Sequence, residues 1–323
     1  MLNRTAESLF WIGRYMERAE NHARLIDVYY HTQQEDMISI RHHVCKWSYI
    51  VESVGYRPDF EARYINYSEE NVLAYIILDK ENPNSLISCI SQARHNLRTL
   101  REQAPTELWD SLNSCFLWLK EQDITHIMES TPHQFLQQVK NWTALFLGTA
   151  QSVMPRDNEW FFLESGRMLE RTENTLRIVQ MVERITSDIG KNNMLAFPFL
   201  QALLKSLSGY QTFRKLYLDQ FNVECISEFI MFNTKFPRSI QFTLTKLLEY
   251  IKGIEFTDAK LSRAHMRMQK QTSKALTEFD CRENDGLAPA LVDTALITDL
   301  LELCYSIGHG FTKTFFQSNE VSA

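Results

Sequence analysis

The chain has 323 residues and a formal net charge of −6, with 34 Lys and Arg against 40 Asp and Glu. This acidic balance argues against a general affinity for nucleic acid or anionic membranes, because phosphate binding needs a basic field. Only ten Gly and eight Pro are present, and strand-type alternation is scarce, so we expect an all-α fold. No apolar run is long enough for a membrane span, and charges interrupt the N-terminus where a signal peptide is apolar, which predicts a cytoplasmic location.

The first half of the chain shows helical periodicity broken by short turn signals. Ser68 and Thr106 stand where they can cap helices, and Pro132 suits a first helical turn. Residues 56–67 are rich in aromatic and charged side chains and are predicted to form a loop. The predicted helices cover residues 3–31, 34–54, 68–78, 84–101, 106 onward, and 131–151.

The second half follows the same plan after a linker at residues 154–158, which holds a Pro and two capping residues. A long helix is predicted over 158–188 and ends at a break over 190–193. Further helical segments are separated by Pro198, Gly209 and Pro237. A loop is predicted at 283–289, a last helix over 291–316, and a frayed tail over 317–323.

One stretch is written twice. Residues 13–24 and 166–177 share Gly, Arg, Glu, Arg, Glu, Asn and Arg at seven positions 153 residues apart, while most neighbouring positions differ. A second, shorter sequence match, which we call the second echo, relates residues 82–86 to residues 236–240 at an offset of 154. We therefore predict two tandem, internally duplicated helical bundles packed together, with domains at 1–154 and 155–323.

On a helix, the repeated stretch separates into an apolar face and a polar face. Three interpretations of the polar face remain open: a partly buried network joining the two halves, a ligand or partner site, or a solvated face. The Gly in both copies suggests close approach of another backbone or a ligand, because Gly weakens a helix. The predicted site residues of the two copies are Arg14, Glu17, Arg18, Asn21 and Arg24, and Arg167, Glu170, Arg171, Asn174 and Arg177.

A column of arginines follows the second echo. Arg94, Arg98 and Arg101 are spaced i, i+4, i+7 and share one helix face. Together with Arg14, Arg18 and Arg24 they could form a pocket for a phosphate or carboxylate group if the two helices touch. The alternative is that Glu17, Glu20 and Glu102 neutralise these arginines.

Signatures of known chemistry are absent from the sequence. It holds no phosphate-binding loop, dinucleotide-binding motif, nucleophile elbow or His-Glu-x-x-His zinc motif. None of the nine His follows a Glu by three residues, so we expect no metal site and no cofactor. Six scattered Cys without a Cys-x-x-Cys pair predict reduced core residues rather than disulfides or zinc ligands.

The opening Met-Leu-Asn-Arg-Thr-Ala-Glu-Ser-Leu-Phe-Trp-Ile-Gly-Arg-Tyr-Met-Glu-Arg-Ala-Glu-Asn resembles the Alpha-E family, bacterial helical proteins named for a Glu-Arg motif. That motif is Glu17-Arg18 here. Further matches are Asn-Pro-Asn-Ser at 82–85, Ala-Arg-His-Asn-Leu-Arg at 93–98, Glu-Leu-Trp at 107–109 and Phe-Pro-Arg-Ser at 236–239. The family usually has Glu where this chain has His95.

The resemblance implies a genomic setting rather than a known activity. Alpha-E proteins are typically encoded beside, or fused to, a circularly permuted ATP-grasp ligase, often with a transglutaminase-like peptidase nearby. The first hypothesis is therefore a non-catalytic partner that binds the ligase or its peptide substrate through the Glu-Arg helices. The second is an enzyme on an anionic or peptide substrate, with Glu17 or Glu170 as general base, which needs a raised carboxyl pKa.

Overall fold

The computed structural model describes residues 3–38, 47–54, 57–189, 197–218, 220–255, 259–284 and 294–316. Over these residues the chain forms fifteen α-helices and one short π-helical turn, and no strand. The all-α prediction is confirmed. None of the described helices has the length and apolar character needed to cross a lipid bilayer.

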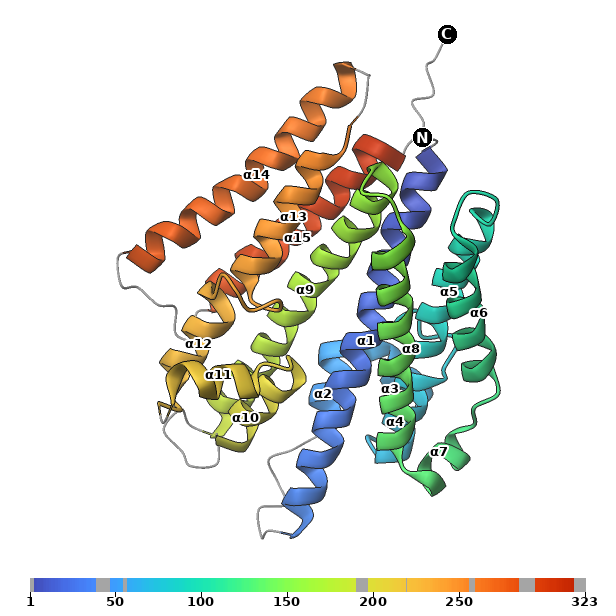
Figure 1. Ribbon diagram of the computed structural model, residues 1–323. Coiled ribbons are helices and arrows are strands. Elements are labelled where there is room, and N and C mark those ends of the chain that lie inside the picture. The colour runs from blue at the N-terminus through green and yellow to red at the C-terminus, as the bar shows by residue number, and fades with distance from the viewer. Residues whose placement is uncertain are drawn as a thin grey trace.

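Two long helices form the centre of the molecule: α1 (Asn3–Ile38) and α9 (Asn158–Ile189) lie side by side (Figure 1). The first half adds α2 (Trp47–Val54), α3 (Arg57–Arg63), α4 (Glu69–Ile77), α5 (Leu86–Thr99), α6 (Thr106–Lys120), α7 (Ile124–Ser130) and α8 (Pro132–Val153). The second half adds α10 (Phe197–Ser206), α11 (Tyr210–Tyr217), α12 (Val223–Phe232), α13 (Ile240–Gly253), α14 (Ala259–Asn284), α15 (Thr294–Phe311) and the π-helical turn η2 (Thr312–Phe316).

The two halves pack by the same scheme. Helix α1 contacts α5 and α8, α5 contacts α6, and α6 contacts α8. In the second half, α9 contacts α13 and α15, α13 contacts α14, and α14 contacts α15. One helix of each half also packs on the central helix of the other half: α10 packs on α1, and α2 packs on α9. These parallels agree with a duplication, but descent from one unit and separate domains at 1–154 and 155–323 stay predictions.

The matched glycines mark the closest approach of the two central helices. A Cβ atom built on Gly13 would lie deep inside van der Waals contact with the backbone oxygen of Leu163. A Cβ atom on Gly166 would clash in the same way with the backbone oxygen of Phe10. Each helix thus needs a residue without a side chain where the other helix's backbone passes.

The predicted loop at 56–67 is wrong over 57–63, where α3 forms. Pro58 lies in its first turn, where the missing N–H costs nothing, and Asp59 and Arg63 suit its N- and C-terminal ends. Phe60 is fully buried and stacks with Tyr64 at a centroid distance of 5.0 Å. One of the aromatic side chains that suggested a loop, Phe60, is therefore a core residue of a short helix.

Other boundaries follow local capping chemistry. Ser68, Ser85 and Ser239 accept hydrogen bonds from the backbone N–H three residues on and begin α4, α5 and α13. Thr106 was expected to cap α6, but Pro105 occupies that position and the helix has no side-chain cap. The first helix runs to Ile38, beyond its predicted end, while the predicted break at 190–193, loop at 283–289 and tail at 317–323 lie wholly or largely outside the described residues.

The hydrophobic core forms one cluster that draws residues from both halves. Cys89, Cys115 and Cys304 are buried within it, and burial raises the thiol pKa of Cys89 and Cys115 to about 12. Cys281 is exposed, so the prediction of a core residue is wrong there. Cys45 lies outside the described residues.

Candidate functional site

The two repeated polar faces meet each other between α1 and α9. Glu17 is fully buried, and Arg14, Asn21, Glu170 and Arg171 each expose 8% or less of their surface. The interpretation as a solvated face is therefore wrong. These residues form one buried charge network at the centre of the protein.

Two reciprocal ion pairs make up the heart of this network. Arg171 donates from Nε and Nη2 to the two carboxylate oxygens of Glu17, both at 2.7 Å. Arg18 donates from Nε and Nη2 to the carboxylate of Glu170, at 2.6 and 3.1 Å. Each Glu-Arg dipeptide therefore supplies its glutamate to the arginine of the other copy. We call the pair Glu17–Arg171 the first clamp and the pair Glu170–Arg18 the second clamp.

Each clamp glutamate also receives an amide from its own helix. Asn21 donates to Glu17 at 3.1 Å, and Asn174 donates to Glu170 at 3.3 Å. Both contacts span one helical turn, so the spacing Glu-x-x-x-Asn serves the same purpose in each copy.

A second arginine completes each clamp, and its source differs. Arg14 of α1 reaches Glu170 at 2.6 Å and forms a two-pronged pair with Glu173 at 2.8 and 3.1 Å. Glu17 instead receives Arg238, which precedes α13, at 3.1 Å. Arg238 also donates to Asn21, and to Glu20 at 2.9 Å.

The clamps strongly favour the ionised carboxylates. Burial alone would raise the pKa of Glu17, but Arg171 and Arg238 more than offset it and lower the pKa to about 2. Burial likewise opposes ionisation of Glu170, yet Arg14 and Arg18 lower its pKa to about 2. Neither carboxylate is tuned to accept a proton near neutral pH.

The remaining predicted residues of the repeat lie at the ends of the network. Arg24 pairs with Glu20 at 2.7 Å and donates to Ser208 at 2.8 Å. Arg167 turns to Glu164 within α9 at 3.1 Å. Arg177 is half-buried and donates to the Tyr305 hydroxyl at 3.0 Å.

The predicted arginine column is not wholly on one helix: Arg94 and Arg98 lie on α5, which ends at Thr99, and Arg101 lies in the turn after it. Arg94 lies over the rings of Phe116 and Trp109 of α6 and donates to Asn113 at 2.8 Å. Arg101 lies over Trp109 as well, and Arg98 is exposed. Because Arg14 and Arg18 are engaged by carboxylates of α9, these contacts do not bring the two columns together around one anion.

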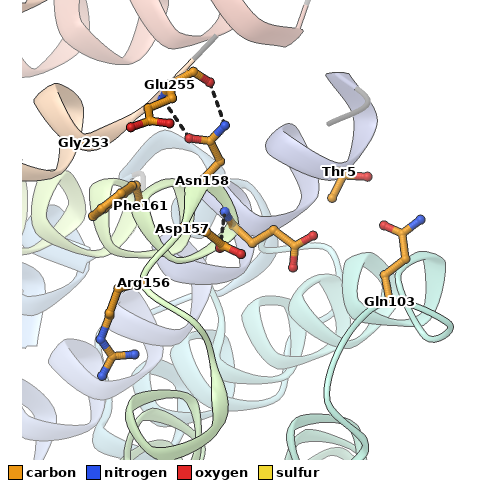
Figure 2. A pocket seen from close by; sticks show the side chains of 9 residues that line it. Thr5, Gln103, Arg156, Asp157, Asn158, Phe161, Gly253 and Glu255 are labelled. Carbon is orange, nitrogen blue, oxygen red and sulfur yellow. Dashed lines mark hydrogen bonds between the residues drawn. The ribbon is translucent and has the colours of Figure 1, made fainter.

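An open hollow of about 730 Å³ lies where α9 begins, as Figure 2 shows. Asn158 exchanges two hydrogen bonds with the backbone of Glu255, at 2.7 and 2.8 Å, and so joins the start of α9 to the end of α13. Arg156 stacks on Trp160 and donates to backbone oxygens, and the three acidic residues of the lining outnumber this one arginine. Its lining is Thr5, Gln103, Arg156, Asp157, Asn158, Glu159, Phe161, Gly253 and Glu255, none of them a predicted site residue.

A second hollow, of about 570 Å³, lies between α2, α9 and α15 and includes Arg177. Tyr49 donates to Asp188 at 2.8 Å there; burial and this carboxylate raise the pKa of Tyr49 to about 12. Arg184 pairs with Glu52. Since Glu52, Glu183 and Asp188 accompany its two arginines, this hollow does not concentrate positive charge.

The sequence prediction missed Arg238 and the carboxylates Glu164 and Glu173 as members of the site. A signal for Arg238 was present, because it lies in the Phe-Pro-Arg-Ser echo of Asn-Pro-Asn-Ser, at the position that matches Asn84. Asn84 accepts a hydrogen bond from Arg18 at 2.8 Å. Asn84 thus lies beside the second clamp, and Arg238 lies beside the first.

Sequence similarity to known proteins covers most of this chain. Uncharacterised proteins of Mycobacterium bovis and of Mycobacterium tuberculosis are 22% identical to this chain over 318 residues, which cover 90% of this chain and 34% of each relative. The chain therefore spans about a third of the length of these relatives. No solved structure matches it. The sequence profile of Alpha-E, described as a predicted alpha-helical domain with a conserved ER motif, matches residues 1–316, and the chain belongs to this family.

Proposed function

We propose that this protein is a non-catalytic helical partner of an amide- or peptide-forming ATP-grasp ligase, and that its Glu-Arg motif holds the fold together. The observation that carries the structural role of the motif is the reciprocal pairing of Glu17 with Arg171 and of Glu170 with Arg18. Both glutamates are buried and bound by two arginines each. Contact with a ligase or its peptide substrate is therefore assigned to the outer helices rather than to the Glu-Arg faces.

The same contacts weigh against a general base at Glu17 or Glu170. A base working near neutral pH needs a carboxyl pKa raised toward that pH. The pKa of each clamp glutamate lies at about 2 instead, and removing an arginine would be needed to change this. The enzyme alternative has less support than the partner.

The length of the relatives supports a role beside other protein segments. In the mycobacterial proteins, the region similar to this chain accounts for about a third of the polypeptide. An Alpha-E unit that helps an attached or neighbouring domain would need a stable fold and an outer contact surface. The buried clamps supply the first of these requirements.

Co-expression with the neighbouring ATP-grasp ligase that the family resemblance implies tests this proposal. We expect the ligase to copurify with the wild-type protein and its amide-forming rate to depend on it. A Glu17→Gln variant that is still folded by circular dichroism should retain both effects. Loss of the rate effect in a folded Glu17→Gln protein would favour the enzyme alternative, and absence of both copurification and rate effect with the wild type would reject the partner role.

A further inference from the structure

We propose that Asp27, His31 and His133 form a binding site for one divalent transition-metal ion between α1 and α8. This site lies apart from the clamps and is independent of the proposed partner role. Asp27 and His31 are one turn apart on α1, and His133 lies in the first turn of α8, which packs on α1.

The three ligand atoms converge on one point. His133 Nδ1 lies 2.7 Å from Asp27 Oδ1, His31 Nε2 lies 3.1 Å from His133 Nδ1, and His31 Nε2 lies 3.7 Å from Asp27 Oδ1. Ligand atoms bound about 2.0–2.2 Å from one ion lie about 3.0–3.5 Å apart in tetrahedral or octahedral geometry. Small side-chain adjustments therefore suffice to place an ion among the three atoms.

Burial divides the site into an anchored ligand and two open ones. The side chain of Asp27 is 8% exposed, whereas those of His31 and His133 are 51% and 45% exposed. Lys140 donates to Asp27 Oδ2 at 2.8 Å, which fixes the carboxylate and leaves Oδ1 directed at the two imidazoles. Such a contact orients a metal-binding carboxylate, although the Lys charge also opposes a cation and limits affinity.

The donor set selects the class of metal. Two imidazole nitrogens and one carboxylate oxygen suit Zn²⁺, Co²⁺, Ni²⁺ or Fe²⁺ better than Mg²⁺ or Ca²⁺, which prefer oxygen ligands. Three protein ligands and exposed imidazoles leave at least one coordination position to solvent, as in metal sites that are open to a substrate. At the 153-residue offset the second copy has Gln180 and Arg184 instead of Asp27 and His31, so the site belongs to one half.

The spacing Asp-x-x-x-His on α1 was visible in the sequence but was not predicted as a site. The expectation of no metal was based on Glu-x-x-His pairs, which place two ligands on one helix. Here the third ligand comes from residue 133, more than 100 positions away, and only the packing of α8 on α1 brings it to Asp27.

Titration of the untagged protein with Co²⁺ and Zn²⁺ tests the site. We expect one equivalent to bind by calorimetry, with weak visible Co²⁺ bands typical of nitrogen and oxygen ligands and no intense near-ultraviolet thiolate band. Mg²⁺ should not compete.

Two variants and a matched control decide whether these residues bind the ion. His31→Gln and His133→Gln should each weaken Zn²⁺ binding at least tenfold and abolish the metal-dependent rise in Tm, while both variants stay folded because their imidazoles are half-exposed. His126→Gln removes an exposed His on α7 and should bind like the wild type. The proposal would be overturned if the wild type had no stoichiometric site or if the Co²⁺ spectrum showed a thiolate band. It would also be overturned if His31→Gln and His133→Gln bound Zn²⁺ as tightly as the wild type.

Discussion

The two clamps between α1 and α9 use the same pair of residue types, yet a different neighbour completes each one. Around Glu170, both arginines come from α1: Arg18 and Arg14. Around Glu17, one arginine comes from α9 and the other, Arg238, from the turn before α13. The position that matches Arg238 in the first half is Asn84, which contributes an amide oxygen to Arg18.

This difference shows that the two clamps share the number of arginines around each glutamate but not the source of those arginines. Arg167 matches Arg14 by sequence, but it lies 4.0 Å from Glu17 and binds Glu164 instead. Arg238 supplies the close hydrogen bond to Glu17 that the more distant Arg167 does not. Two close guanidinium groups around each buried glutamate are therefore kept, while the helix or turn that provides the second one has changed.

The largest expected effect comes from leaving arginines buried without their carboxylate. Glu17→Ala strands Arg171 and Arg238, and we expect the free energy of unfolding to fall by about 3–5 kcal/mol. Urea denaturation measures this loss. Glu249→Ala, which removes one partner of an exposed pair with Lys246, should cost no more than about 1 kcal/mol and serves as the control. Equal losses in the two variants would contradict a structural clamp.

Acid should weaken both clamps together. The pKa of Glu17 and of Glu170 is about 2 in the folded protein and near 4.5 in an unfolded chain, so their contribution to stability is present above about pH 5. As the pH falls from about 5 to about 2, the two glutamates bind protons in the unfolded state before they do so in the folded state. The free energy of unfolding should therefore decrease over this interval. Denaturant titrations of the wild type and of Glu17→Gln at a series of pH values measure this decrease in the free energy of unfolding. A variant with the same pH dependence as the wild type would show that the first clamp does not carry this effect.

Replacing Arg238 with Asn makes the surroundings of the first clamp resemble those of the second at this position. Glu17 keeps Arg171 but loses a charged hydrogen bond, which is worth about 1.5–3 kcal/mol. Asn84→Ala removes a neutral acceptor from Arg18 and should cost less. A double-mutant cycle between Glu17 and Arg238 should show coupling, whereas one between Glu17 and Asn84 should show little.

The glycine contact can be tested with a built-in control. Gly13→Ala and Gly166→Ala each push a methyl group into the facing backbone, and we expect each to lower stability by about 1–3 kcal/mol. Gly148 is also helical, but no atom lies within 4 Å of a Cβ placed there. Gly148→Ala should therefore raise stability by up to about 1 kcal/mol in the same thermal or urea unfolding measurement.

The sequence predicts the central helices and their polar faces because both depend on local periodicity. The repeat also indicates which residues matter: Gly13 faces the backbone of α9, Glu17 pairs with the second copy's Arg171, and Arg18 pairs with its Glu170. What periodicity cannot reveal is the partner across an interface. The arginines were predicted either to form an anion pocket or to be neutralised by Glu17, Glu20 and Glu102, whereas Arg14 and Arg18 meet carboxylates of α9.

Short elements were harder to predict for a related reason. Phe60 is a core residue because the ring of Tyr75, which belongs to α4, packs against it at a centroid distance of 5.1 Å. In a single sequence, a dense run of aromatic and charged residues fits a loop equally well. The cluster of Asp27, His31 and His133 was missed in the same way, since its third member is contributed by a separate helix.

The exchange of α2 and α10 between the halves has a consequence for how the chain can be divided. A break between α8 and α9 would separate α10 from α1, and α2 from α9. It would also leave every clamp with one member on each piece. Two such fragments, produced together, should assemble into the intact fold, while either one alone should stay incompletely folded. The family unit would then tolerate a split gene as long as both parts are made in the same cell.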